Sequence, residues 1–482
     1  MAIDSPAVPD TGSATALSPS SPSDSPAPVR MSARAKLILM VLCAAQFIVA
    51  LDFSILNVAL PALGADLGMG QADLQWAVTA FALPSGGFLL LFGRIGDLYG
   101  RRRLFLAGLA LFAASSVLAT LAWSPAAFLA GRALQGLGAA VIVPTGMSLL
   151  TTTFAEGPER ERALGISGTL MSLGFTVGMV LGGGMTDTLG WRSTMGLLAV
   201  AAVLVLAVAP GLLPESRTPD RPRLDLPGAV TVTGGLLAVI YALSTAGERG
   251  FGGADVLVTL VLGVALLVAF VIVESRTEQP LVSLPMLRRR TVAWGNAGGL
   301  VTFSMMSTVI FVLTLYLQEV LELSSFETGL VFGVQGLASA VAGSYAPKVI
   351  ARFGAHRTLV GGLLGQGVFG AALLGAGTAG WSVWLATAAL SLASVFHLGA
   401  IIAYGVTATS GVPDGEQGLA TGLVTSTQQV GLTIGIPLLG VLATTGDDLM
   451  SGVHLVLGLD AAIVVAAALL IGAGLRRRSD SA

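Results

Sequence analysis

The segment Leu51-Asp52-Phe53-Ser54-Ile55-Leu56-Asn57-Val58-Ala59-Leu60-Pro61 places a carboxylic acid inside an otherwise apolar run. A membrane-crossing helix needs about 20 predominantly apolar residues, and the run 37–60 that contains Asp52 is long enough to span a bilayer. A charge at the centre of such a helix costs about 2.5–3.5 kcal/mol, so it normally faces a partner or a cavity. The segment therefore predicts a membrane helix that carries a functional or tightly paired acid.

Apolar windows of this kind recur along nearly the whole chain. Bounding them by charges, Gly and Pro gives fourteen predicted spans: 37–60, 74–95, 104–123, 126–154, 163–185, 193–213, 228–246, 256–273, 292–316, 328–346, 358–378, 382–406, 417–443 and 452–475. Their lengths suit helices that cross the hydrocarbon region. The sequence therefore predicts an all-α integral membrane protein that lies in a lipid bilayer.

The composition excludes several other classes. Of 482 residues, 54% are hydrophobic and 11% are charged, whereas a soluble domain carries about 25% charged residues. The net charge of −2 gives no electrostatic basis for nucleic-acid binding. Cys43 is the only cysteine, and no Gly-rich phosphate loop occurs. We therefore expect no enzyme activity, no metal and no cofactor, with an ion gradient as the energy source.

The basic residues predict an orientation, because Lys and Arg concentrate in cytoplasmic loops. With the N-terminus inside, 22 of the 25 Lys and Arg residues fall on the cytoplasmic side. Arg192 and Arg249 fall outside, and Arg132 lies within a span. We therefore expect an even number of spans with both termini in the cytoplasm.

The link between the second and third spans reads Gly93-Arg-Ile-Gly-Asp97-Leu-Tyr-Gly100-Arg101-Arg102-Arg103. Asp97 and Arg101 are four residues apart and would pair if the helix continues through them. Gly93 and Gly100 would allow close helix packing and a tight turn. The alternative is a basic loop that only fixes the topology.

A degenerate second copy of this link favours a functional interpretation. A shift of 254 residues aligns Tyr99-Gly100 with Phe353-Gly354, although Asp97 then falls on Ala351. Repeated halves with such a loop are typical of transporters built from internal repeats.

These residues carry a resemblance to the major facilitator superfamily. The link resembles motif A of that family, the Asp52 segment is similar to the first-span signature of its fourteen-span drug:proton antiporters, and Arg132-Ala-Leu-Gln135-Gly136-Leu-Gly138 resembles motif B. The resemblance covers roughly residues 36–475. It implies two six-helix halves with two inserted helices, and a conformational latch formed by Gly93, Asp97, Gly100 and Arg101.

The expected organisation combines the spans with this resemblance. The expected regions are a disordered cytoplasmic tail (1–35), an N-terminal six-helix half (36–213), a linker with two inserted helices (214–291), a C-terminal six-helix half (292–475) and a cytoplasmic tail (476–482). The first 30 residues hold seven Ser and six Pro, a composition that buries too little apolar surface to offset the entropy of ordering.

Three departures from the family pattern concern the direction of transport. Leu98 follows the acid of motif A where a basic residue is usual. Met179 occupies the place of the expected proline in the fifth span, and the aromatic run before the sixth span is reduced to Trp191-Arg192-Ser193. These departures leave an uptake symporter of an apolar metabolite as an alternative.

Asp52, Arg132 and Asp460 are the clear charges of the predicted membrane interior. Burial and a neighbouring cation act on a carboxyl group in opposite directions, so Asp52 is a candidate for binding and releasing protons. Arg132 is a candidate electrostatic partner, with Gln135 one helical turn away. The alternatives are a hydrogen-bonded structural acid and a permanent ion pair. Asp460 matches no family signature, and packing explains it equally well.

Small residues and amides mark two further spans. Gly174, Gly178 and Gly182 share one face of the fifth span at i, i+4 spacing, and Gly431 and Gly435 form a similar groove in the thirteenth. Glycines at this spacing permit close helix packing, and packing alone would also explain their presence without a role in transport. Gln428 and Gln429 precede the second groove and face either the cavity or a neighbouring helix.

The predicted substrate cavity is largely apolar, because flexible Met and aromatic surfaces suit varied apolar ligands. We expect its lining to include Asn57, Gln135, Phe303, Met305, Met306, Phe396, His397, Tyr404 and Gln428. Individually, each is also explained as core packing, and His397 as a structural histidine.

The sequence as a whole predicts proton-coupled efflux of hydrophobic drug-like or antibiotic compounds across a bacterial cytoplasmic membrane. The partners would be protons, a small hydrophobic substrate and the lipid bilayer, with the protein acting as a monomer. A non-transporting membrane sensor is the alternative from another class, although a sensor has no need of a proton site.

Overall fold

The computed structural model describes residues 31–154, 157–215, 225–250, 252–277, 284–413, 417–444 and 448–476. All regular secondary structure in these ranges is helical. Most of the expected N-terminal tail, most of the linker after Pro214 and most of the C-terminal tail lie outside the described residues. The expected tail boundary at residue 35 is slightly wrong, because Ser32 caps a helix that begins at Ala33.

The first half of the chain forms seven helical segments. They are α1 (Ala33–Leu67), α2 (Gln71–Gly87), α3 (Leu89–Tyr99), α4 (Arg101–Thr120), α5 (Pro125–Thr153), α6 (Pro158–Leu189) and α7 (Trp191–Leu212). The predicted span 74–95 is not one straight helix, because α2 and α3 meet at a bend of 44°. Pro84 and the Gly86-Gly87 pair precede the bend, and both Pro and Gly interrupt the regular helical hydrogen bonding.

The remaining helices form the second half of the chain, and the first two of them are the pair expected to be inserted between the halves. Its helices are α8 (Leu226–Arg249), α9 (Ala254–Glu274), α10 (Leu284–Leu287), α11 (Arg290–Leu315), α12 (Ser325–Phe353), α13 (Ala355–Ala372), α14 (Ser382–Thr409), α15 (Gln417–Leu439) and α16 (Leu449–Arg476). A π-helical turn, Tyr316–Val320, extends α11. Helices α13 and α15 end in short 3₁₀ turns, Leu373–Gly375 and Gly440–Thr444.

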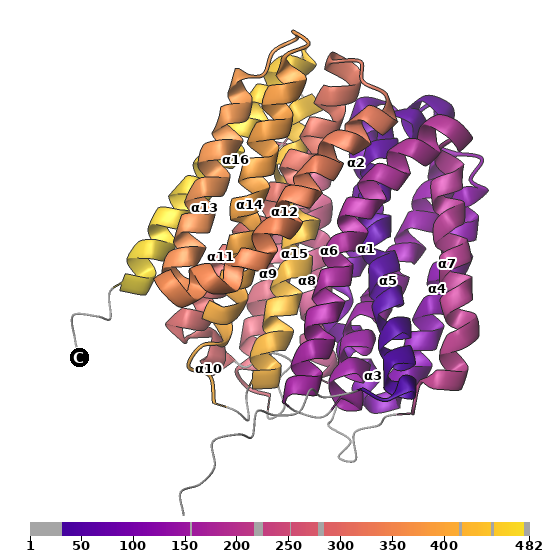
Figure 1. Cartoon of the computed structure of the whole chain (residues 1–482), viewed down its shortest axis with the longest axis vertical. Helices are drawn as coiled ribbons and strands as arrows, with labels where there is room; N and C mark the ends of the chain where they lie inside the picture. The colour runs from indigo at the N-terminus through magenta and orange to yellow at the C-terminus, as the bar shows by residue number, and fades with distance from the viewer. Residues whose placement is uncertain are drawn as a thin grey trace, which may run out of the picture.

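Twelve of the described helices are long and apolar enough to cross a membrane, or thirteen if the bent α2–α3 pair counts as one span. Helix α15 has 23 residues but is rich in Thr, Gln and Gly, which lower its hydropathy. Figure 1 shows α15 running alongside the apolar helices. The expected count of fourteen spans is therefore compatible with the described helices.

The two halves lie side by side (Figure 1), with the indigo-to-magenta helices on one side and the orange-to-yellow helices on the other. Two pairs of helices join the halves, because α6 packs against α12 and α15 packs against α2. The inserted helices α8 and α9 pack against each other, and α8 also packs against α2 and α15. We call the lower end in Figure 1, where α3, α10 and the Arg101–Arg103 turn lie, the basic end.

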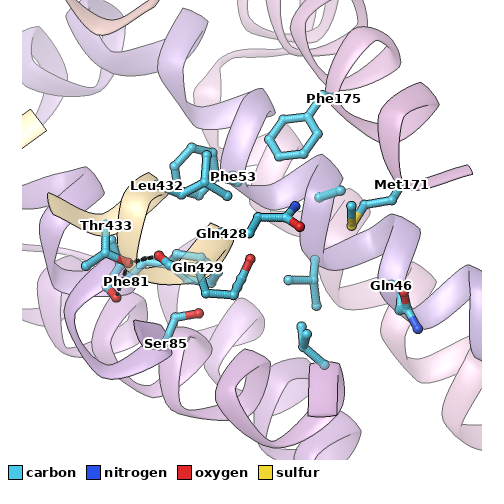
Figure 2. A pocket seen from close by; sticks show the side chains of 14 residues that line it. Gln46, Phe53, Phe81, Ser85, Met171, Phe175, Gln428, Gln429, Leu432 and Thr433 are labelled. Carbon is cyan, nitrogen blue, oxygen red and sulfur yellow. Dashed lines mark hydrogen bonds between the residues drawn. The ribbon is translucent and has the colours of Figure 1, made fainter. Parts of the chain in front are cut away.

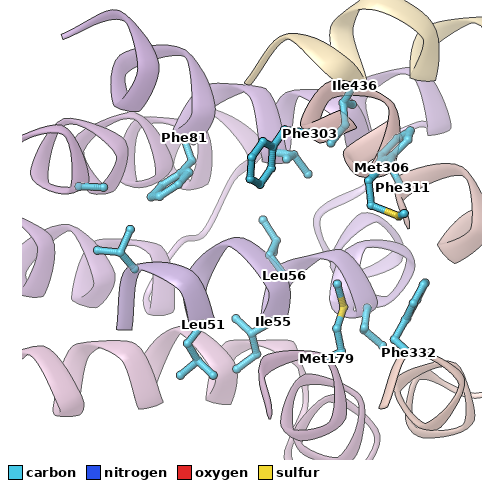
Figure 3. Packing of buried hydrophobic residues seen from close by; sticks show 14 of the residues in the cluster. Leu51, Ile55, Leu56, Phe81, Met179, Phe303, Met306, Phe311, Phe332 and Ile436 are labelled. Carbon is cyan, nitrogen blue, oxygen red and sulfur yellow. The ribbon is translucent and has the colours of Figure 1, made fainter. Parts of the chain in front are cut away.

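Buried apolar side chains from both halves form one large cluster. Figure 3 shows members of this cluster from both: Leu51, Ile55 and Leu56 on α1, Phe303 and Met306 on α11, and Met179, Phe332 and Ile436 nearby. Lipid tails are as apolar as these side chains, so close packing rather than escape from water must hold the helices together.

Glycines let α6 approach α1, and α15 approaches α11 in the same way. A Cβ atom on Gly174 would lie 3.0 Å from the Phe47 carbonyl oxygen, and one on Gly182 would lie 2.6 Å from that of Ile55. In the other half, a Cβ atom on Gly431 would lie 3.1 Å from the Leu300 carbonyl oxygen. Gly178 and Gly435 are packed at least as tightly, against Ser54 and Ser304.

A serine strengthens each of these two crossings. The Ser54 hydroxyl lies 3.3 Å from the Gly174 carbonyl oxygen, and the Ser304 hydroxyl donates to the Gly431 carbonyl oxygen at 3.0 Å. The glycine faces inferred from sequence spacing are therefore helix contacts that occur once in each half.

The internal repeat is also visible where α3 meets α4. Gly100 has φ 108° between these helices, and Gly354, 254 residues later, has φ 82° between α12 and α13. Residues with a side chain rarely adopt such backbone angles. The α-helix ends at Tyr99 and α4 begins at Arg101, so Asp97 and Arg101 do not lie on one continuous helix, and their pairing stays a prediction.

The end opposite the basic end is closed by contacts between α6 and α12. A Cβ atom on Gly329 would lie 2.6 Å from the Met179 carbonyl oxygen, and one on Gly333 would lie 2.8 Å from the Val180 side chain. The Phe326 amide at the start of α12 donates to the Asp187 carboxylate at 2.8 Å. With backbones this close, nothing larger than a side chain fits between α6 and α12.

Candidate functional site

The two charges predicted for the first and fourth spans meet inside the N-terminal half. The Arg132 guanidinium on α5 donates to the Asp52 carboxylate on α1 at 2.6 Å, and the side chains are 1% and 0% exposed. Arg132 also donates to the Gln135 amide oxygen at 2.9 Å and to the Ala77 carbonyl oxygen on α2 at 3.2 Å. Three helices therefore hold one buried ion pair in place.

The network continues to α4 but leaves one atom free. Gln135 donates to the Ser116 hydroxyl at 2.8 Å, and Ser116 donates to the Phe112 carbonyl oxygen at 2.6 Å. By contrast, Oδ2 of Asp52 is buried and has no hydrogen-bond partner. Buried carboxylate oxygens normally accept hydrogen bonds, and this oxygen is an available position for a proton.

A small cavity lies between the two halves, next to this network. Its volume is about 40 Å³, enough for about three water molecules. The lining residues are Gln46, Val49, Ala50 and Phe53 on α1, Phe81, Ala82 and Ser85 on α2, Val143 on α5, Met171 and Phe175 on α6, and Gln428, Gln429, Leu432 and Thr433 on α15. Figure 2 shows Gln428 and Gln429 at the centre of the view, with Phe53 and Phe175 above them and Ser85 below.

Phe81 separates the ion pair from the cavity. The Arg132 guanidinium carbon lies 4.6 Å from the centre of the Phe81 ring, and the same ring lines the cavity. Phe53 packs edge-on against Phe81 with ring centres 6.4 Å apart. Asp52 and Arg132 are absent from the cavity lining, so a ligand in the cavity contacts Phe81 and Phe53 rather than the charges.

The predicted cavity residues divide between several places. Gln428 lines the cavity, whereas Gln135 belongs to the ion-pair network. Asn57 is 2% exposed and donates to the Phe53 carbonyl oxygen at 2.7 Å, one turn back along α1. Neither Asn57 nor Gln135 lines this cavity, so their place in a substrate cavity stays a prediction.

The aromatic wall predicted in the C-terminal half is a packed cluster away from the cavity. Phe303 contacts His397 and Tyr404 edge-on, with ring centres 5.7 and 6.0 Å apart. Met306 and its neighbour Met305 are buried in the core. None of these five residues lines the cavity, because α15 lies nearer the N-terminal half and supplies that wall instead.

Phe396 is also outside the cavity, since it stacks on Phe369 of α13 with ring centres 5.5 Å apart. The Nδ1 atom of His397 lies 2.8 Å from the Thr302 hydroxyl, which also donates to the Gln366 amide oxygen at 2.5 Å. These contacts give His397 a structural partner within the C-terminal half.

The remaining predicted residues are placed as follows. Gly93 packs near Pro144 at an ordinary distance, and Arg101 begins α4 directly after Gly100. The side chain of Asp97 lies outside the described residues, so the predicted latch stays a prediction. Asp460 on α16 is 2% exposed and one of its oxygens has no partner. Among the described residues, no group of three or more His, Cys, Asp or Glu side chains is placed to hold a metal ion.

Sequence reasoning missed most of the cavity lining. Gln46, Val49, Ala50 and Phe53 follow an i, i+3, i+4, i+7 pattern, which marks one face of α1. In a helix that is apolar all round, the residues of this face are no different in character from the residues of the neighbouring faces. On α1 the usable signal was Gln46, a polar residue inside an apolar span.

Comparisons with known proteins agree with this architecture. The family profile of the Major Facilitator Superfamily matches residues 42–436. Two similar proteins are the "Cephamycin export protein CmcT" of Amycolatopsis lactamdurans, which is 38% identical over 85% of each chain, and the "Puromycin resistance protein pur8" of Streptomyces alboniger, which is 38% identical over 84% of this chain and 81% of the relative.

Solved structures share the fold at low identity. A peptide transporter POT in complex with sulfate superposes with a TM-score of 0.70 at 15% identity, covering 91% of this chain and 94% of that chain. The human organic anion transporter MFSD10 (TETRAN) gives a TM-score of 0.60 at 16% identity, covering 92% and 100%. The family match, together with the similarity to these two relatives over most of their length, shows that the chain belongs to the major facilitator superfamily of membrane transporters.

Proposed function

We propose that this protein exports hydrophobic drug-like or antibiotic compounds in exchange for protons. The observation that carries the proposal is the Asp52–Arg132 pair, buried in the membrane interior with one carboxylate oxygen free and next to a cavity between the halves. Relatives that export cephamycin or confer puromycin resistance support antibiotic-like substrates. The protein would act as a monomer in the bacterial cytoplasmic membrane, with both termini inside and no cofactor besides the coupling proton.

The closed conformation supports alternating access. A cavity of about 40 Å³ holds a few waters but no drug-sized molecule, so the halves must separate before a substrate enters. The opposite end is held by the α6–α12 contacts, which favours opening first at the basic end. Substrate would enter there, the halves would rock, and a proton taken up by Asp52 from outside would reset the transporter.

The ion gradient supplies enough energy for this cycle. One charge crossing about 100 mV is worth about 2.3 kcal/mol. This energy corresponds to an approximately fifty-fold concentration ratio for each proton. Export of toxic compounds therefore needs no nucleotide hydrolysis.

Inverted membrane vesicles test the proposal directly. The vesicle lumen is made acidic, a pH-sensitive dye reports its pH, and a panel of lipophilic drugs is added to wild type and Asp52→Asn. We expect drug-triggered proton release from the lumen in wild type and none in Asp52→Asn. Asp460→Asn is the matched control, because it removes another buried carboxyl group far from the cavity, and it should retain the exchange.

Each other outcome points to a different function. Proton movement into the lumen together with drug would indicate symport, the direction that the Met179 departure leaves open. Retained exchange in Asp52→Asn would show that the coupling site lies elsewhere. The absence of proton movement with every compound, while the compounds bind, would favour a sensor.

A further inference from the structure

We infer that the cavity selects uncharged aromatic substrates that carry a hydrogen-bond acceptor, and that it rejects organic cations. This inference rests on the proposed function and specifies its substrate class. None of the fourteen residues that line the cavity is ionisable. The lining combines phenylalanine rings with neutral amides and hydroxyls, so a ligand finds apolar surface and hydrogen bonds but no counter-charge.

Three rings form the aromatic part of the site. Phe53 meets Phe175 with ring centres 5.9 Å apart and an angle of 72° between the planes. It meets Phe81 at 6.4 Å and 63°. Edge-on rings leave both faces and edges available to a flat ligand, and the flexible Met171 can adapt to its outline. Figure 2 shows Phe53 and Phe175 above Gln428, and Phe81 beside Gln429.

An unpartnered amide defines the polar part. Gln46 is 5% exposed, its amide oxygen accepts from the Ser167 hydroxyl at 3.0 Å, and its amide nitrogen has no partner. A buried donor without a partner is costly, and a ligand acceptor would relieve that cost. Gln428 and Gln429 face the same cavity from the other half, so an acceptor-bearing ligand would be held from both sides.

Cations gain too little in this cavity to offset the loss of their hydration. The Asp52 carboxylate is paired with Arg132, and the Arg132 guanidinium lies over the Phe81 ring that lines the cavity. The face of Phe81 already holds the Arg132 guanidinium. The remaining ring faces attract cations only weakly compared with the cost of desolvation. A proton on Asp52 would also leave the Arg132 charge uncompensated beside the cavity, which repels a second cation.

Direct binding separates this inference from the proposed function. Detergent-purified protein is dialysed against three radiolabelled probes: the uncharged aromatic amide chloramphenicol, the monocation tetraphenylphosphonium and the dication dequalinium. Wild type should bind the amide at least tenfold more tightly than either cation. Replacing Gln46 with Leu should weaken amide binding about tenfold, the value of one hydrogen bond, and should leave cation binding unchanged.

A gain of function provides the sharper test. Gln428→Glu places a carboxylate in the cavity and should bring tetraphenylphosphonium binding to within a few-fold of amide binding. Gln428→Met, the uncharged control of similar size, should not. Equal or tighter binding of cations by wild type, failure to bind the amide, or no gain in Gln428→Glu would overturn the inference. Selective amide binding without proton exchange in vesicles would leave the inference standing and refute the proposed proton coupling.

Discussion

Replacing Arg132 with Met removes the cation but keeps most of the side-chain volume, and it leaves Asp52 with no partner on either oxygen. Breaking a buried pair by removing one partner costs about 3–5 kcal/mol. Replacing Asp52 with Asn costs a similar amount, because the guanidinium then stays buried without a counter-charge. If the two losses were independent, the double variant would lose about 6–10 kcal/mol.

We expect the double variant to be more stable than either single variant. With both charges gone, the remaining costs are the donors that the Gln135 amide oxygen and the Ala77 carbonyl oxygen lose. Ala77 lies within α2, where backbone hydrogen bonding remains, so the unpaired Gln135 oxygen is the larger cost at about 1–3 kcal/mol. The coupling between the two positions should therefore amount to several kcal/mol. This value follows from the contacts of the pair and does not depend on the transported substrate.

The assay compares the temperature at which each detergent-purified variant loses half of its monodisperse gel-filtration peak. Unfolding of a large membrane protein is irreversible, so these temperatures rank kinetic stability rather than equilibrium stability. Asp460→Asn combined with Arg132→Met is the control, because these side chains share no contact and their effects should add. A double variant of the pair that is less stable than both single variants would refute the reasoning.

Three further predictions concern packing, the cavity and a helix cap. Gly178→Ala should lower the temperature at which half of the gel-filtration peak is lost, because the new Cβ atom would overlap α1. Gly165→Ala, on the same helix, places its Cβ atom in open space and should leave that temperature unchanged. Equal temperatures for the two variants would contradict the packing. Phe81→Leu should weaken binding of aromatic amides several-fold in equilibrium dialysis, and unchanged binding would exclude the ring from the site. Hydrogen bonds from the Ser451 hydroxyl and from two backbone amides lower the pKa of Asp448, the cap of α16, below 3.8. The cap should therefore stabilise α16 above that pH and lose its effect as the pH falls through the lower, folded-state pKa. Hydrogen exchange in the first turn of α16 should show this loss in wild type but not in Asp448→Ala.

Much of the architecture was accessible from the sequence. Apolar windows located the spans within several residues, because the bilayer fixes the length of a crossing helix. The glycine spacing of α6 and α15 located two close helix crossings, since only small residues allow such an approach. The shift of 254 residues identified a repeat whose Gly100 and Gly354 share positive backbone angles.

Other features could not be read from the sequence. The bend between α2 and α3 depends on how Pro84 and the glycines are accommodated by neighbouring helices. By composition, the aromatic residues around Phe303 fit a drug-binding wall as well as they fit a packed core. In the structure, Phe303 packs against His397 and Tyr404. Composition cannot separate a wall from a core when both are built from the same apolar residues.

The sequence by itself determined that the chain is a membrane bundle with repeated halves, and which charges lie inside it. Burying a charge in lipid is so costly that each such residue stands out. Only the tertiary structure decided that Asp52 pairs with a residue 80 positions away and that Phe81 separates this pair from the cavity. In helices that are apolar on every side, hydrophobic patterning no longer marks the inward face, so packing between helices alone sets which side chains meet.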